Sequence, residues 1–116
     1  MAALYVAIED FDKTSLLSAR DGAIQRFEFT SELSWKTVRE YLMCEGVTAI
    51  NTPKSVMIEA FAAGVIDDAG WIQILNDRNA TSQIYDENET DKIFKRIRER
   101  HILLFQKLSD NFSSVM

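Results

Sequence analysis

The sequence predicts an all-α protein, namely an up-and-down antiparallel four-helix bundle with one extra short helix. Apolar residues recur at steps of three and four, no alternating strand pattern of useful length occurs, and start and stop signals separate the helical segments by short links. With 116 residues and no low-complexity break, the chain has the length of one domain. We therefore expect a single helical domain over residues 1–116.

The first two helices are predicted from apolar stripes. A short stripe ends near Asp12, with Asp12, Thr14 or Ser15 available to cap the next helix; its members are Leu4, Ala7, Ile8 and Phe11. A long helix follows, with inward positions at Ile24, Phe27, Ser31, Trp35, Val38 and Leu42. Phe29 and Leu33 add a second apolar edge, which predicts burial on more than one side. Gly46 is the expected left-handed residue after this helix.

Capping signals locate the third and fourth helices. Thr52-Pro53 predicts a helix start, because threonine caps free amides and proline is tolerated at the first helical position. The expected inner face of this short helix is Val56, Met57, Ala60 and Phe61. Gly64 is its expected terminator, and Asp67 or Asp68 is the expected cap of a fourth helix that carries Trp71, Ile72 and Leu75 and ends near Arg78.

The last predicted helix opens at Asn88 and continues toward the C-terminus. Its apolar seam comprises Phe94, Ile97, His101, Leu104, Leu108 and Phe112. A histidine on such a seam is usually packed or hydrogen-bonded, so His101 is interpreted as structural. The cations of this helix are interleaved with Glu99 and apolar residues, which favours a solvated face formed by Lys92, Lys95, Arg96, Arg98 and Arg100.

Composition excludes several functional classes. A net charge of −5 argues against a protein that binds nucleic acid over its whole surface. No run approaches the roughly 20 apolar residues of a membrane span, and acidic residues follow the apolar start at once, unlike a secretory signal. A cytoplasmic protein without membrane partners is expected, in which the single Cys44 forms no internal disulfide.

Metal and nucleotide sites are not expected within this chain. It has one histidine and one cysteine, which leaves no spaced ligand pair for zinc. Its four glycines lie in no phosphate-binding frame. No cofactor is predicted for the chain itself.

The segment from Arg78 to Glu87 is the strongest functional candidate. Arg78 precedes Tyr85 by seven residues, a spacing that on a continuous helix places guanidinium and hydroxyl on one face, able to meet one phosphate. Asn79 and Ser82 add a polar pair. The structural alternative is that Arg78 merely complements the helix dipole at a C-terminus.

A partner interface is a second candidate, near the start of the long helix. Trp35 and Trp71 are most simply core anchors, and the functional alternative is that Trp35 contacts a partner. Arg26 and Glu28 bracket Phe27, and their structural alternative is a surface ion pair worth ~0 to 1 kcal/mol.

Three separated motifs carry a family resemblance: Arg26-Phe27-Glu28-Phe29-Thr30 with Glu32-Leu33 and Trp35-Lys36-Thr37, then Glu59-Ala60-Phe61 with Ala63-Gly64, then Asp77-Arg78-Asn79 with Thr81-Ser82 and Tyr85-Asp86-Glu87. With them the chain resembles the nucleotidyltransferase substrate-binding family, the HepT-like branch of the HEPN proteins, and the helical domain of kanamycin nucleotidyltransferase. The resemblance implies an all-α homodimer that works with a separately encoded small nucleotidyltransferase, whose chemistry uses magnesium and a nucleoside triphosphate.

The resemblance also assigns roles within the third motif. HEPN ribonucleases cleave RNA without metal by using an arginine and a histidine, and here Gln83 occupies the histidine position. A glutamine amide cannot exchange a proton near neutral pH, so cleavage is not expected, whereas Arg78 and Asn79 can still bind phosphate. In toxin-antitoxin members a tyrosine at the place of Tyr85 accepts AMP from the nucleotidyltransferase. Relatives also commonly carry an aromatic residue at the position of Ser31.

Three hypotheses follow. The first is a non-catalytic helical subunit that binds a minimal nucleotidyltransferase and presents the segment from Arg78 to Tyr85 to it. The second is a metal-independent ribonuclease toxin that tolerates Gln83, with RNA as its substrate. The third is a degenerate dimerisation module without a ligand.

Overall fold

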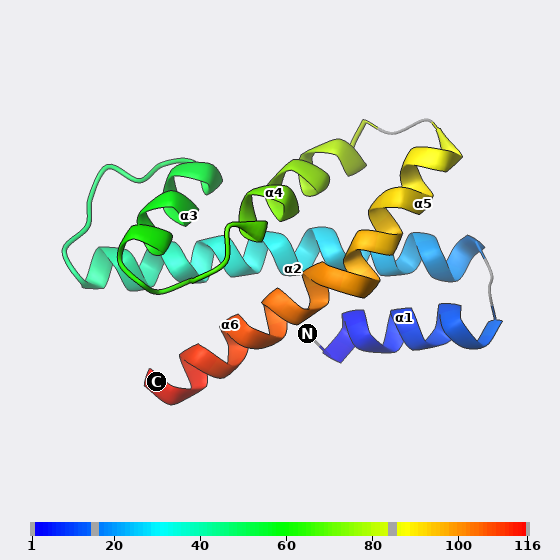
Figure 1. Ribbon diagram of the computed structural model, residues 1–116, viewed down its shortest axis with the longest axis horizontal. Helices are drawn as coiled ribbons and strands as arrows, with labels where there is room; N and C mark the ends of the chain where they lie inside the picture. The colour runs from blue at the N-terminus through cyan, green and yellow to red at the C-terminus, as the bar shows by residue number, and fades with distance from the viewer. Residues whose placement is uncertain (1, 15–16, 84–85, 116) are drawn as a thin grey trace.

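The computed structural model describes residues 2–14, 17–83 and 86–115, and within these ranges every regular element is a helix (Figure 1). The elements are α1 (Ala2–Thr14), α2 (Leu17–Cys44), α3 (Pro53–Ala62), α4 (Gly70–Thr81), α5 (Glu87–Arg96), the π-helical turn η1 (Ile97–His101) and α6 (Ile102–Val115). The predicted all-α class is confirmed. Among the described residues, no helix combines the length and apolar character that crossing a membrane requires.

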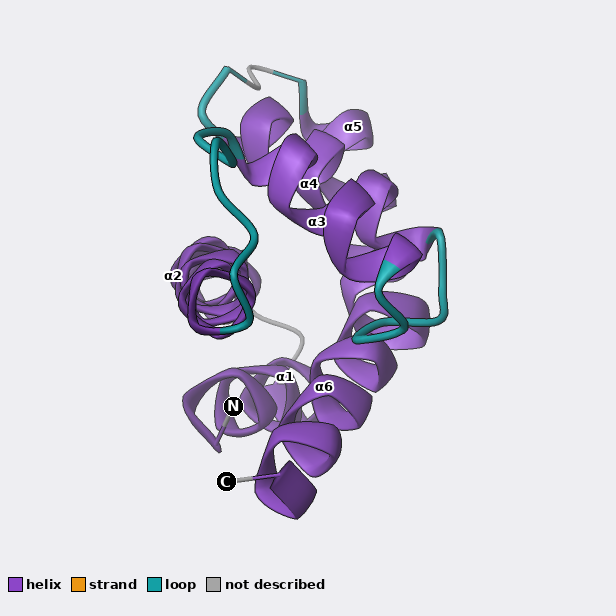
Figure 2. Cartoon of the chain, turned by 90° about the vertical axis from the view of Figure 1, so that its left-hand side faces the viewer, coloured by secondary structure: helices purple, strands orange, loops and turns teal. Residues whose placement is uncertain are grey.

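The long helix α2 organises the fold. It contacts α1, α3, α4 and α5, while α4 also contacts α3 and η1. Figure 2, which looks along α2, shows α3 and α4 on one side of it and α1 with α6 on another. The molecule is elongated, at 46 × 29 × 18 Å.

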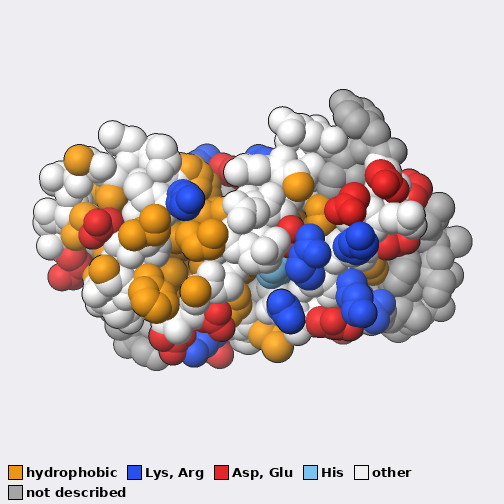
Figure 3. All heavy atoms as spheres, turned by 45° about the horizontal axis from the view of Figure 1, so that its top comes forward, with side chains coloured by type: hydrophobic (Ala, Val, Ile, Leu, Met, Phe, Trp, Pro, Cys, Tyr) orange, Lys and Arg blue, Asp and Glu red, His pale blue; other side chains and the backbone are white. Residues whose placement is uncertain are grey.

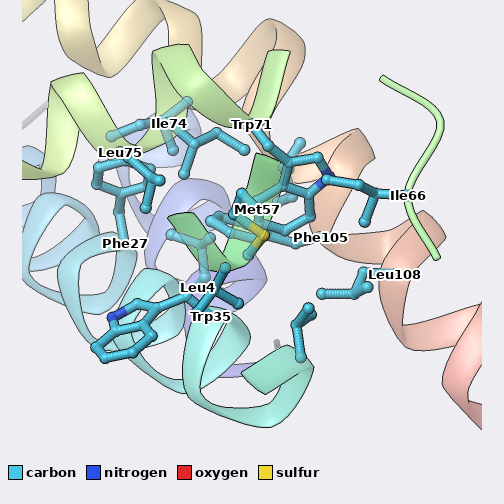
Figure 4. Close-up of a cluster of buried hydrophobic side chains, with 14 of the residues drawn as sticks. Leu4, Phe27, Trp35, Met57, Ile66, Trp71, Ile74, Leu75, Phe105 and Leu108 are labelled. Carbon is cyan, nitrogen blue, oxygen red and sulfur yellow. The ribbon is translucent and has the colours of Figure 1, made fainter. Parts of the chain in front are cut away.

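The core forms where α2, α4 and the C-terminal helices converge (Figure 4). Phe27 is fully buried, and its ring lies 6.0 Å from that of Phe105, which in turn meets Trp71 edge-on at 5.6 Å. Burying each such ring contributes ~2 to 3 kcal/mol. Ser31, at an inward position of α2, is also buried. Its hydroxyl donates a hydrogen bond to the carbonyl of Phe27 at 2.9 Å, so the polar group is satisfied although its side chain is smaller than an aromatic one.

Two predicted core positions of α2 and one of α3 are wrong. Phe29 and Leu33 are 70% and 58% exposed, and Phe61 is 51% exposed. A residue two places along a helix lies about 200° around its axis, so Phe29 faces away from the core side that Phe27 defines. The second apolar edge of α2 is therefore an exposed apolar patch, not part of the core.

The predicted ends of α2 and α3 are confirmed. Thr52 caps α3 by accepting a hydrogen bond from the amide of Ser55 at 3.1 Å, and the Ser55 hydroxyl accepts one from the amide of Thr52 at 3.2 Å. Gly46 and Gly64 follow the two helices with φ of +92° and +77°, the left-handed conformation that glycine adopts without a steric penalty.

Other boundaries differ from the prediction by a few residues. α1 continues to Thr14, so the predicted capping positions Asp12 and Thr14 lie inside this helix, and Ser15 lies outside the described residues. The N-cap residue of α4 is Ala69, so neither Asp67 nor Asp68 holds the predicted N-cap position. Asp68 nevertheless accepts a hydrogen bond from the first amide of the helix, that of Gly70, at 2.7 Å. α5 begins at Glu87, because Asp86 caps it through the amide of Asn88 at 2.8 Å.

The last predicted helix is continuous but includes an unpredicted π turn. α5, η1 and α6 follow one another without a break, and the amide of Ile102 donates to the carbonyl of Ile97, five residues back. The extra residue in this turn shifts the helical register. Ile97 and His101, at the two ends of this turn, are both fully buried on the core side.

Candidate functional site

Arg78 and Asn79 line a cleft of about 240 Å³ between α2, the start of α3 and α4. Its walls include Glu32, Trp35, Lys54, Asn76, Arg78 and Asn79. The side-chain amides of Asn76 and Asn79 and the ammonium of Lys54 have no polar partner among the described residues. The cleft therefore offers uncommitted donors beside the candidate arginine.

The Arg78 guanidinium is already in contact with a carboxylate. Its Nε lies 3.0 Å from Oε1 of Glu32, and the other carboxylate oxygen lies 3.7 Å from Nζ of Lys36. The first distance is that of an ion pair, yet Nε is a buried atom without a well-directed hydrogen bond among the described residues. The ion pair is therefore close but poorly aligned, and both side chains remain partly exposed, at 27% and 34%.

The proposed alignment of Arg78 with Tyr85 on one helix is wrong. α4 ends at Thr81, with Ser82 as its C-cap, and α5 begins only at Glu87. Gln83 is exposed, and its backbone amide closes the helix end by donating to the carbonyl of Ala80 at 3.0 Å. Tyr85 lies outside the described residues, so its candidate role as an acceptor stays a prediction.

The predicted polar pair of Asn79 and Ser82 has a structural use. The Ser82 hydroxyl donates to the backbone carbonyl of Asn79 at 2.9 Å, and the Thr81 hydroxyl donates to that of Arg78 at 2.7 Å. These bonds satisfy carbonyls that the helix end leaves without partners. The Asn79 side chain lines the cleft, whereas the Ser82 hydroxyl is engaged at the helix end.

Asp77, the neighbour of Arg78, anchors a buried polar network that sequence reasoning missed. Arg96 donates to both carboxylate oxygens, from Nε at 2.8 Å and from Nη2 at 2.7 Å. Gln73 donates at 3.0 Å, and Nε2 of His101 lies 2.7 Å away. Burial alone would raise the pKa of Asp77, but hydrogen bonds from His101, Arg96 and Gln73 outweigh it and hold the pKa at about 2.

His101 therefore belongs to the interior, which confirms its structural interpretation. It is 1% exposed and stacks on Phe27, with ring centroids 5.5 Å apart. Because Asp77 stays ionised at neutral pH, the hydrogen in their contact resides on Nε2 of the imidazole. Of the five cations predicted to form a solvated face, four are exposed, whereas Arg96 is half-buried and pairs with the buried Asp77.

A second missed group joins α2 to the start of α5. The side chain of Arg20 is 3% exposed and lies within 3.0 Å of Asp21 and 2.8 Å of both Glu87 and Asp91. The hydrogen bond with Glu87 is the largest cause of a raised pKa for Arg20, despite burial. A sequence signal existed, because Arg20 precedes Ile24 and Phe27 on the inward stripe of α2, just as Asp77 lies on the stripe of Trp71 and Ile74.

The three candidate interface residues have different settings. Trp35 is 9% exposed and belongs to the core cluster, with the cations of Arg39 and Lys36 at 5.5 and 5.9 Å from its ring. Its interpretation as a core anchor is confirmed, as is that of Trp71 at 3%. Arg26 is exposed, Glu28 is half-buried, and neither forms an ion pair with a described residue.

No metal site is found in the part of the chain that the structure describes, where no group of three His, Cys, Asp or Glu side chains is suitably placed. Cys44 is a free, exposed thiol. The cleft is lined by the donors of Lys54, Asn76, Arg78 and Asn79 together with the carboxylate of Glu32.

Comparison with known proteins places the chain in a family. A family model described as "Nucleotidyltransferase substrate binding protein like" matches residues 1–114. The chain belongs to this family. Among its relatives is a Haemophilus influenzae (strain ATCC 51907 / DSM 11121 / KW20 / Rd) protein named "Probable ribonuclease HepT", 36% identical over 84 residues. That match covers 66% of this chain and 56% of the relative, so it spans little more than half the relative's length.

Proposed function

We propose that this nucleotidyltransferase substrate-binding protein is a non-catalytic helical subunit that binds a separately encoded minimal nucleotidyltransferase. Arg78 and Asn79 bind a phosphate of the nucleotide, and Tyr85 is the acceptor. The observation that carries the proposal is the cleft at the end of α4, where Arg78 and Asn79 meet uncommitted donors while position 83 holds a glutamine. Such a site offers donors for a phosphate, and it lacks the histidine that HEPN ribonucleases use in RNA cleavage.

The transfer itself belongs to the partner, whose carboxylates hold magnesium and a nucleoside triphosphate. The phenol oxygen of Tyr85 would bond to the α-phosphorus while the bond from that phosphorus to the β-phosphate breaks, and pyrophosphate would be the leaving group. The phenol proton passes to a carboxylate of the partner. In this division of work the present chain supplies the acceptor and the phosphate donors, and the metal stabilises the leaving group.

A homodimer is part of the proposal. The exposed Phe29 and Leu33 lie one turn apart on α2 and together form an apolar surface, and burial of that surface against a second copy supports the dimer. We interpret the contacts of α2 with α1, α3, α4 and α5 as an up-and-down bundle with α3 as the extra helix. Arg26 and Glu28, on the same helix, are assigned to the partner surface.

Co-expression with the nucleotidyltransferase from the adjacent reading frame tests the proposal. The expected result is a stable complex and, with ATP and magnesium, a mass increase of one AMP that is absent in Tyr85→Phe. Arg78→Gln should lower the rate of modification without dissociating the complex. Absence of both the complex and the adduct would remove the proposal's support.

The name of the Haemophilus relative favours one second candidate, an RNA-cleaving toxin. Its test is incubation of the purified protein with RNA and no metal, for the natural chain, Gln83→His and Arg78→Ala. Cleavage by the natural chain that Arg78→Ala abolishes would establish this candidate. Cleavage only by Gln83→His would indicate an enzyme that lost its histidine and kept its scaffold, whereas silence of both favours the subunit role.

A further inference from the structure

Glu32 occupies the position in the cleft that an anion bound to Arg78 would take. We propose that the Glu32 carboxylate is an internal substitute for the ligand's phosphate, held by Arg78 while the site is empty and displaced when a phosphate group binds. The inference rests on the proposed role of Arg78 in binding phosphate. It adds a competition within the protein that sets the affinity of that site.

The quality of the Arg78–Glu32 contact is what makes displacement feasible. One guanidinium nitrogen lies 3.0 Å from one carboxylate oxygen, and it makes no well-directed hydrogen bond there. Arg96 shows the alternative within the same protein, because it engages Asp77 through two nitrogens at 2.8 and 2.7 Å. Bidentate pairs between arginine and a carboxylate are strong, whereas a single, partly exposed contact contributes little to stability. Glu32 is thus a weak competitor for Arg78.

The displaced carboxylate has a second partner at hand. Lys36 follows Glu32 by one helical turn on α2, and its ammonium is already 3.7 Å from the other carboxylate oxygen. A glutamate followed four residues later by a lysine is a favourable helical pair. Glu32 can therefore rotate toward Lys36 and solvent and remain paired, which lowers the cost of vacating Arg78.

A phosphate gains more from the vacated position than the carboxylate does. It brings more oxygen atoms and, as a terminal phosphate, more charge, so it can engage the Arg78 fork at two points. Lys54 and the amides of Asn76 and Asn79 line the same cleft without partners among the described residues. None of these donors is bonded to the Glu32 carboxylate, and a larger anion in the cleft could accept hydrogen bonds from them.

Titration of the isolated chain with inorganic pyrophosphate tests the inference. The Nε–H resonance of Arg78 and the indole N–H resonance of Trp35 report on the cleft, and Trp71→Phe assigns the latter because the chain has two tryptophans. At constant ionic strength, Glu32→Gln should bind pyrophosphate about tenfold more tightly than the natural chain, since an unfavourable charge about 4 Å from the phosphate is removed. Glu32→Ala should do the same, and Arg78→Gln should abolish the shifts.

Glu40→Gln is the matched control, because it removes an exposed carboxylate two turns further along α2. If it tightens binding as much as Glu32→Gln, the effect is one of net charge and the inference is overturned. Equal affinity of the natural chain and Glu32→Gln, with binding still lost in Arg78→Gln, overturns the competition but leaves the phosphate role of Arg78 intact. If no variant binds pyrophosphate, both fail, while association with the nucleotidyltransferase is judged separately by co-purification.

Discussion

Asp77 and Arg78 are adjacent in α4, yet they differ in burial and in how fully their charges are hydrogen-bonded. Asp77 is 3% exposed and takes part in four hydrogen-bonding contacts with Gln73, Arg96 and His101. The Arg78 side chain is 27% exposed and makes one poorly aligned contact with Glu32. Of these two adjacent residues, Asp77 is a buried charge that joins helices, whereas Arg78 is a partly exposed charge that is able to change partners.

The difference shows what decides whether an ion pair is structural. A buried charge is tolerated only when its hydrogen-bonding capacity is filled, so its partners cannot leave without a large penalty. A partly exposed charge has water as an alternative, and its partner can be exchanged at little cost. The same residue types, aspartate or glutamate with arginine, therefore serve the scaffold on one side of α4 and the cleft on the other. On the face of the molecule drawn in Figure 3, most of the apolar side chains lie over one half and most of the charged side chains over the other.

Removing the buried carboxylate of Asp77 should have the largest effect on stability. Asp77→Ala leaves Arg96 and His101 without their acceptor and should lower the free energy of unfolding by about 3 to 5 kcal/mol. Urea denaturation measures this loss. Asp67→Ala, which removes an exposed carboxylate paired with Lys107, is the control and should leave the midpoint nearly unchanged. A midpoint for Asp77→Ala equal to that of the control would contradict a structural role for the network.

Acid should weaken the buried network around Asp77 and so lower the free energy of unfolding. The pKa of Asp77 is about 2 in the folded protein, below its ordinary 3.8, because its hydrogen bonds outweigh the effect of burial. A carboxylate with a lowered folded pKa stabilises the fold above the unfolded pKa, and this stabilisation, about 2 kcal/mol, is lost as the pH falls from about 4 to 2. Urea midpoints at pH 7, 4 and 2.5 should show this loss in the natural chain and a smaller one in Asp77→Asn.

A milder change tests the imidazole alone. His101→Phe keeps a ring against Phe27 but removes the donor to Asp77, so we expect a loss of about 1 to 3 kcal/mol in the free energy of unfolding. The acid-dependent part of stability should shrink as well, since one cause of the lowered pKa of Asp77 disappears. A variant as stable as the natural chain would mean that stacking, not the hydrogen bond, is the contribution of His101.

The sequence predicted the helices well because local signals determine them. The three- and four-residue apolar steps and the caps at Thr52, Gly46 and Gly64 act within one or two turns, and the structure bears them out. The errors arose where a choice depends on contacts distant in sequence. Phe29 is exposed because of how the other helices pack, and nothing in its neighbouring sequence indicates that.

In the candidate site, too, local sequence predicted some residues, whereas those that depend on distant contacts were missed. Arg78 and Asn79 were found because they are unusual residues at a helix end, and the structure places both at the cleft. Glu32 was missed as their neighbour, since 46 residues separate it from Arg78 in the chain. The end of α4 at Thr81 depends on serine and threonine hydroxyls that bond backward to the helix, which a spacing argument for Tyr85 does not consider.

The smallest effect on stability is expected for the Arg78–Glu32 pair. Glu32→Gln and Arg78→Gln should each change the free energy of unfolding by only about 0 to 1 kcal/mol, because the pair is partly exposed and poorly aligned. The double variant should show a coupling energy in the same range by urea denaturation. A coupling above about 2 kcal/mol would place Arg78 with Asp77 as part of the scaffold, and an arginine so firmly held would be unable to exchange Glu32 for a phosphate.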